Sequence, residues 1–325
     1  MARIVLGLGT SHTPMLLVDG SDLPRYEEND RRLSLLDLAG DPISFDVLLA
    51  KASGRYDRQV SAEHLVGRHQ AAHGAMAGLS DALGSAALDA LIVIGDDQKE
   101  MLRGEQSPPL LVYDRPSIRS QRPPHAPNRP AWALRGSDRF YPADGPRDYP
   151  VAQELARHLT AQLGSRVGAA AFEGDDVSMG HAFAFVHSQL MPDPPIPIVP
   201  VLLNALYPPN QPTPSRCLEI GEAIADAVAA FPGDARVGVV ASGGLSHFVV
   251  DEALDREVIR ALTERDYTAL AALPVEKLNS GNGEIRNWIC AAGALRPLGI
   301  ERVDYIPGHR TRAGTGVGLG FAVWR

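Results

Sequence analysis

The chain alternates short apolar runs with polar turns and longer amphipathic stretches. Apolar runs at 2–9, 90–94, 196–203 and 237–241 have the length and composition of strands that are buried on both faces of a sheet. Helices are predicted between and after them, over 61–83, 151–164, 181–190, 215–231 and within 253–298, with further strands at 167–172, 301–306 and 316–324. This order predicts an α/β fold, a single large domain over 1–325 in which helices flank a mixed, mostly parallel central sheet.

Two long stretches interrupt the regular alternation. Residues 20–85 begin with polar, irregular sequence, and residues 105–150 contain many prolines, arginines and aromatic residues. Long ordered segments of this kind in compact domains are often functional lids. We therefore predict that both stretches are insertions or lid segments.

Polar side chains follow the carboxyl ends of the four apolar runs. In chain order they are His12, then Asp97 with Gln98, then Asn204, then His247. Ligands of open α/β sheets bind outside the carboxyl ends of the strands. The pattern predicts that these side chains share one active site.

Composition narrows the class of protein. The net charge of −8 argues against a nucleic-acid partner, because phosphates require basic patches. Two cysteines, Cys217 and Cys290, are too few for a disulfide scaffold and fit a reducing cytosol. The first residues lack the pattern of a signal peptide, and no apolar run approaches the roughly 18 residues that span a membrane. The expectation is a cytoplasmic protein with no membrane partner.

His12 and His247 suggest metal or proton chemistry. Neutral imidazole is a common metal ligand and a general base near neutral pH. His247 also follows two glycines, which allow a tight turn and a close approach of the backbone. A carboxylate would complete a two-His, one-carboxylate site with open positions for substrate and oxygen. Spacing alone does not select that carboxylate among the 39 acidic residues.

Four segments carry a resemblance to a known family. They are Thr-Ser-His-Thr-Pro (10–14), Val-Leu-Leu-Asn-Ala-Leu-Tyr-Pro-Pro (201–209), Gly-Gly-Leu-Ser-His (243–247) and Gly-Glu-Ile-Arg-Asn-Trp (283–288). In this order they resemble the class III extradiol ring-cleavage dioxygenases, the superfamily of the catalytic subunit of protocatechuate 4,5-dioxygenase. The resemblance is specific for the superfamily and does not select a substrate.

The resemblance implies an Fe(II) cofactor and roles for three residues. His12 matches the first iron ligand, Glu284 matches the carboxylate ligand and His247 matches the active-site acid/base. The implied reaction inserts O2 beside the two hydroxyl groups of a small aromatic diol, which is a catechol related to protocatechuate, gallate or methylgallate.

Further expectations concern the substrate pocket and the partners. Asn204 and Tyr207 are predicted to line the pocket. We expect a homo-oligomer. Some relatives use a separate small subunit as a lid, a partner that the resemblance leaves open here, and the stretches 20–85 and 105–150 are candidates for the same task.

The family pattern breaks at the second histidine ligand. The family places this histidine in an Asn-Asp-His turn, whereas this chain has Gln98 at the corresponding position of Gly-Asp-Asp-Gln. Three hypotheses remain open: Gln98 is a weaker oxygen ligand, His181 replaces the imidazole, or the metal is lost. We favour Gln98 as the ligand and His181 as a catalytic residue, because His181 is displaced by two places from the family's Asp-His-Gly element.

Two other functions compete with the dioxygenase. A non-catalytic paralogue would bind no metal, and a metal-dependent hydrolase or lyase would use a redox-inert metal and consume no O2. His64, His69 and His73 are additional potential ligands, which we interpret as surface or packing residues because no acidic residue accompanies them.

Overall fold

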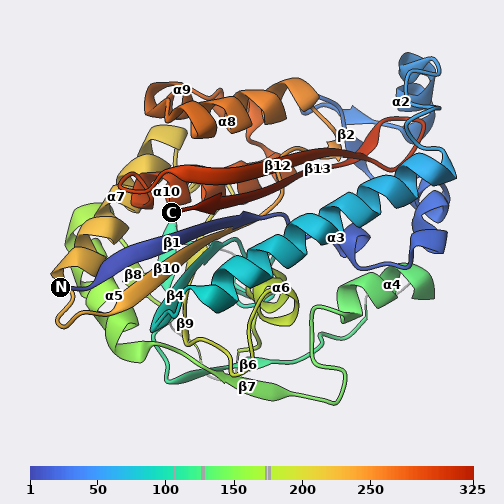
Figure 1. The fold of residues 1–325 in the computed structure, drawn as a ribbon. Helices are drawn as coiled ribbons and strands as arrows, with labels where there is room; N and C mark the ends of the chain where they lie inside the picture. The colour runs from blue at the N-terminus through green and yellow to red at the C-terminus, as the bar shows by residue number, and fades with distance from the viewer. Residues whose placement is uncertain (105–106, 126–128, 173, 175–176) are drawn as a thin grey trace.

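A mixed sheet forms the centre of the computed structural model, which describes residues 1–104, 107–125, 129–172, 174 and 177–325 (Figure 1). Residues 105–106 and 126–128 of the predicted stretch 105–150 lie outside the described residues. Within the described part, nine strands form the sheet in the order β11-β13-β1-β10-β4-β9-β5-β8, and β12 pairs with β13. Their bounds are β1 (Arg3–Thr10), β4 (Ala90–Gly95), β5 (Leu110–Val112), β8 (Ala170–Ala171), β9 (Ile198–Leu203), β10 (Arg236–Ser242), β11 (His247–Val249), β12 (Ile300–His309) and β13 (Thr315–Trp324).

Helices cover both faces of this sheet (Figure 1). They are α1 (Tyr26–Asp30), α2 (Phe45–Ala52), α3 (Ala62–Ser85), α4 (Ala131–Asp138), α5 (Gln153–Val167), α6 (His181–Gln189), α7 (Pro214–Ala230), α8 (Glu252–Glu264), α9 (Tyr267–Ala271) and α10 (Ile285–Ala294). Two small ribbons pair β2 (Leu35–Leu36) with β3 (Pro42–Ile43), and β6 (Ser117–Ser120) with β7 (Arg147–Pro150). A 3-10 turn (Ser280–Glu284) precedes α10.

The central strands β1, β10, β4 and β9 run parallel, and antiparallel strands flank them. Alternate side chains of β4 enter the two cores: Ile92 and Ile94 pack with the helices α5, α7 and α10, whereas Leu91 and Val93 pack with α3 and α6. Every β4 residue is buried, because both faces of the strand are covered. The predicted α/β fold with a mixed central sheet is confirmed.

Two local predictions need correction. The strand expected at 167–172 is reduced to Ala170–Ala171, because α5 continues to Val167. The apolar stripe of Leu155, Leu159, Leu163 and Val167 has the four-residue spacing of one helix face, and all four side chains are buried. The stretch 105–150, predicted as an insertion or lid segment, also contains β5, which pairs with β9 in the main sheet.

Part of the stretch 20–85 likewise belongs to the layered fold. Helix α3 contacts β1, β12 and β13, and its buried residues share a core with Leu6 and Leu8 of β1. The Ser61 side chain caps this helix by accepting from the backbone N–H of His64. In the part of the chain that the structure describes, no helix combines the length and the apolar character needed to cross a membrane.

Helices α7 and α10 pack closely because glycines meet at their interface. A Cβ at Gly221 would lie 2.0 Å from the carbonyl oxygen of Cys290, and one at Gly293 would lie 2.4 Å from that of Leu218. This packing fixes α10 against the sheet and so fixes Glu284, the residue directly before α10.

Gly221→Ala is expected to destabilise the protein, because its methyl group has no space between the two backbones. We expect the free energy of unfolding to fall by about 1–3 kcal/mol, measured by chemical denaturation. Gly67→Ala is the matched control: this exposed α3 residue has no atom within 4 Å of an added Cβ. It is expected to stabilise by roughly 0.5–1 kcal/mol. Equal effects of the two changes would contradict the packing argument.

Candidate metal centre

The candidate site lies at the carboxyl ends of the parallel strands. His12 follows β1, Asp96 follows β4 and the turn Gly243-Gly244 follows β10. His181 opens α6 and Glu284 directly precedes α10, so two helix N-termini complete the site. Parallel pairing brings these strand ends to one edge of the sheet, as the sequence predicts.

The ring of His12 has a defined orientation. Its Nδ1 lies 2.9 Å from Ser242 Oγ, and the Ser242 hydroxyl donates to the carbonyl oxygen of Ala182 at 2.7 Å. Because the hydroxyl proton is used in that bond, Ser242 accepts from Nδ1–H of His12. The lone pair of His12 Nε2 is therefore free, and this buried atom has no hydrogen-bond partner among the described residues. Such a nitrogen is suited to bind a metal ion.

His181 is oriented in a similar way by Glu100. Its Nδ1 donates to Glu100 Oε2 at 2.6 Å, and its backbone N–H donates to the same oxygen at 3.0 Å. The rings of His181 and His12 meet edge to face, with centroids 4.6 Å apart. Burial lowers the pKa of His181, but the carboxylates of Glu100, Asp96 and Glu284 outweigh this effect and raise it to about 10. These carboxylates therefore strongly favour a positive charge at this position.

Glu284 and Asp96 supply two buried carboxylates. Glu284 Oε2 accepts from the Gly244 N–H at 2.6 Å and lies 3.4 Å from His12 Nε2. Burial raises the pKa of Glu284, but nearby histidines, His247 foremost, lower it below its ordinary value. Burial and the charge of Glu284 raise the pKa of Asp96, whose Oδ2 has no hydrogen-bond partner in the described part of the chain.

One potential ligand atom from each of His12, Asp96, His181 and Glu284 falls within 4.8 Å of the others. Two imidazoles and two carboxylates suit a divalent transition metal such as Fe(II), Mn(II) or Zn(II). The buried and unpartnered atoms His12 Nε2 and Asp96 Oδ2 are costly unless a cation or a proton satisfies them. The residues therefore fit a metal ion.

Gln98 takes a different position. Its residue is exposed, whereas Asp96 is fully buried. Asp97 forms the intervening turn, with its carboxylate accepting from the backbone N–H groups of Lys99, Met101 and Leu102. Sequence reasoning named Gln98 and missed Asp96 and Glu100. The signal for Asp96 was its place as the first polar residue after a fully buried strand.

His247 stands beside the cluster. Its Nδ1 donates to the carbonyl oxygen of Leu245 at 2.9 Å, and its Nε2 lies 3.4 Å from Glu284 Oε2. The backbone N–H of His247 donates to Asn282 Oδ1 at 2.6 Å. A Cβ at Gly281 would lie 2.5 Å from His247 Cβ, so the chain needs glycine there. This contact fixes a partly exposed imidazole at the rim of the cluster.

The cluster forms one wall of a cavity of about 640 Å³. His12, His181, His247, Glu100 and Glu284 line it, whereas Asp96 and Asp97 do not. The other lining residues include Gln98 and the aromatic residues Phe140, Tyr141, Tyr207 and Phe248. The volume and the mixture of aromatic and polar groups suit a small aromatic ligand.

The two predicted pocket residues have different roles. Tyr207 lines the cavity, and the Lys99 ammonium lies 4.4 Å from the centre of its ring. Asn204 is buried, and its amide donates to the carbonyl oxygens of Ser107 and Tyr207 while accepting from the Tyr207 N–H. Asn204 therefore fixes the loop that carries Tyr207 and is not among the lining residues of the cavity.

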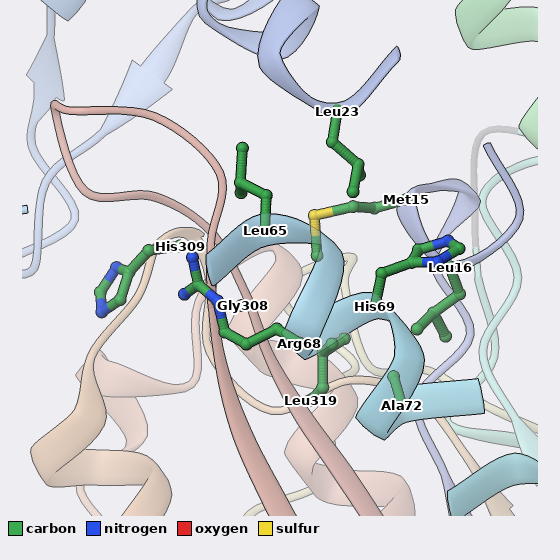
Figure 2. A pocket seen from close by; sticks show the side chains of 10 residues that line it. All are labelled: Met15, Leu16, Leu23, Leu65, Arg68, His69, Ala72, Gly308, His309 and Leu319. Atoms are coloured by element: carbon green, nitrogen blue, oxygen red, sulfur yellow. The ribbon is translucent and has the colours of Figure 1, made fainter. Parts of the chain in front are cut away.

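The helix histidines lie elsewhere, as expected of packing residues. Figure 2 shows His69 with Arg68, His309 and apolar side chains around a second cavity of about 20 Å³. That volume accommodates about one water molecule and no substrate. His73 Nε2 donates to the carbonyl oxygen of Leu16 at 2.7 Å.

Histidines and carboxylates that gather at the carboxyl ends of parallel strands and face a cavity are typical of metal-dependent enzymes. A family model described as the catalytic LigB subunit of aromatic ring-opening dioxygenase matches residues 138–306, just over half of the chain. The chain belongs to this family. The matched region contains His181, His247 and Glu284, whereas His12 and Asp96 precede it.

A curated relative is the gallate dioxygenase of Pseudomonas putida. It is 34% identical over 113 residues, which cover 33% of this chain and 33% of that protein. The aligned region thus spans about a third of the relative's length. The family is one of ring-opening dioxygenases, and the similarity to this relative does not by itself define a substrate.

Proposed function

We propose that this protein is an Fe(II)-dependent extradiol dioxygenase that opens the ring of a catechol related to protocatechuate, gallate or methylgallate. The observation that carries the proposal is the cluster of His12, Asp96, His181 and Glu284 beside His247 in a chain of the LigB family. The donors fit Fe(II), and the cavity fits a single aromatic ring.

In this proposal His12, His181, Asp96 and Glu284 hold the metal. Gln98 is not retained as the third ligand, because its residue is exposed, whereas the buried Asp96 after β4 and the partly buried His181 at the start of α6 have ligand atoms within the cluster. A bound Fe(II) supplies Lewis acidity toward the hydroxyl oxygens of a vicinal diol and redox activity toward O2.

His247 is proposed as the acid/base. Its Nδ1–H is held by the carbonyl oxygen of Leu245, which leaves Nε2 to accept a proton from a substrate hydroxyl and return it to the product. Phe140 and Tyr207 would exclude water and stack on the ring. Arg129 also lines the cavity and offers a partner for a ring carboxylate.

Oxygen consumption tests the proposed function. Protein purified without oxygen and loaded with Fe(II) is expected to consume O2 with at least one of catechol, protocatechuate, gallate and 3-O-methylgallate. With isotopically labelled O2, mass spectrometry should find both atoms of O2 in the ring-opened product. Iron-loaded protein that consumes no O2 with any of these diols would contradict the proposal. Conversion of a diol by the Zn(II)-loaded protein without O2 consumption would indicate a hydrolase or lyase.

Three further expectations remain proposals. The chain forms one catalytic domain over 1–325. Within 20–85 and 105–150, the residues outside α3 and β5 act as a lid. It works as a homo-oligomer, with or without a small lid subunit. It resides in the cytoplasm.

A further inference from the structure

In the turn after β4, the side chains of Gln98 and Glu100 point in different directions. Asp97 accepts three backbone N–H groups, from Lys99, Met101 and Leu102, and thereby closes the turn. Lys99 adopts the left-handed region with φ of 67°, which reverses the chain within the turn. The result is that Gln98 is exposed, whereas the side chain of Glu100 is only 27% exposed and faces His181.

Glu100 holds His181 at two points. One oxygen, Oε2, accepts both the backbone N–H of His181 at 3.0 Å and its Nδ1–H at 2.6 Å. The Nδ1–H bond orients the ring and leaves Nε2 as the nitrogen that can bind a metal ion in place of its proton, and the backbone bond holds the carboxylate beside the ring. A carboxylate on the far nitrogen of a metal-binding histidine is the usual means of orienting such a ligand.

Gly180 provides the space that this contact needs. A Cβ at Gly180 would lie 3.0 Å from Glu100 Oε2 and 3.6 Å from Asp97 Oδ1. The backbone of Gly180 has an ordinary φ of −65°, so its conformation does not require glycine. Glycine at this position leaves room for the approaching carboxylate, which an added Cβ would displace by a few tenths of an ångström.

We propose that Glu100 is a positioning residue that holds His181 as the second imidazole ligand of the metal. The loop after β4 then serves the metal through Glu100, and the exposed Gln98 is not a ligand. This inference rests on the proposed metal site but not on the reaction that the metal supports.

Metal titration tests the inference without an activity assay. Co(II) titrated into the metal-free full-length protein reports affinity, and its visible spectrum reports the ligand set. Glu100→Ala is expected to weaken Co(II) binding by roughly 10–100-fold and to alter the spectrum. Glu100→Gln keeps one acceptor for Nδ1–H and should restore part of the affinity. Gln98→Ala should leave Co(II) affinity and spectrum unchanged.

A matched control comes from a second Glu–His pair. Glu252 Oε1 lies 3.1 Å from Nε2 of His309, which lines the small cavity of Figure 2 and not the site. Glu252→Ala removes a comparable contact and should not change Co(II) binding. Gly180→Ala displaces the Glu100 carboxylate without removing it, and we expect an intermediate loss of affinity.

Two results would overturn the inference. One is Co(II) affinity in both Glu100→Ala and Gly180→Ala equal to that of the unmodified protein. The other is loss of the metal in Gln98→Ala with retention in His181→Ala. The expected Co(II) pattern together with no O2 consumption by the Fe(II) form would instead contradict the proposed reaction and leave the role of Glu100 intact.

Discussion

His12→Ala and Glu284→Ala are each expected to empty the metal site. His12 Nε2 is a buried nitrogen with no other partner in the described chain, and Glu284 is the carboxylate that lies within 3.4 Å of both His12 and His247. Loss of a direct donor should exceed the roughly 10–100-fold effect of an outer partner, so we expect Fe(II) affinity to fall by about 10³-fold or more. Anaerobic titration followed by elemental analysis measures it.

The controls for these two variants are residues of the same type outside the cluster. His64 and Glu276 are both exposed, and their alanine variants should retain the metal at the stoichiometry of the unmodified protein. If His12→Ala or Glu284→Ala also retains full stoichiometry, that residue is not a ligand and the proposed centre is misplaced.

His247→Phe is expected to separate chemistry from metal binding. Phenylalanine keeps the ring volume that packs against Gly281 but cannot accept a proton through Nε2. Turnover per bound iron should fall by about 10²–10⁴-fold, the usual contribution of a general acid/base, while iron stoichiometry stays unchanged. Oxygen-electrode assays beside elemental analysis measure the two quantities.

His125→Phe serves as the control for that variant, because His125 is exposed, pairs with Asp138 and is not among the residues that line the cavity. It should leave turnover unchanged. Loss of iron in His247→Phe, with normal turnover for the iron that remains, would make His247 a ligand and refute the acid/base role.

Local sequence predicted the elements that carry the site. The runs that become β1, β4, β9 and β10 are almost entirely apolar, which identifies them as central strands, and most of their residues are buried in the structure. Because parallel strands end at one edge, the position of His12 and His247 after two such strands was enough to expect a shared site. Short strands such as β11 carry no comparable signal, since their pairing with β13 depends on distant residues.

The proposed donors of the metal site illustrate the limit of that reasoning. Position in the sequence favoured Gln98, since it aligns with the histidine of the family pattern. Whether a side chain in a tight turn faces inward depends on the hydrogen bonds of the turn, and here Asp97 closes it so that Gln98 is exposed. The spacing of residues in the sequence does not predict which side chains of the turn face inward.

The sequence by itself therefore determined the α/β class, the edge of the sheet where chemistry is expected, and the candidates His12 and His247, while the family resemblance added the candidate Glu284. Only the tertiary structure brought Asp96 and Glu100 of one loop against His181 of a distant helix, a contact between residues 81 positions apart. The physical reason is the sequence separation of the residues that interact. Strand burial is encoded by neighbouring residues, whereas a cluster of polar donors forms only where separate elements pack. That packing depends on the whole core.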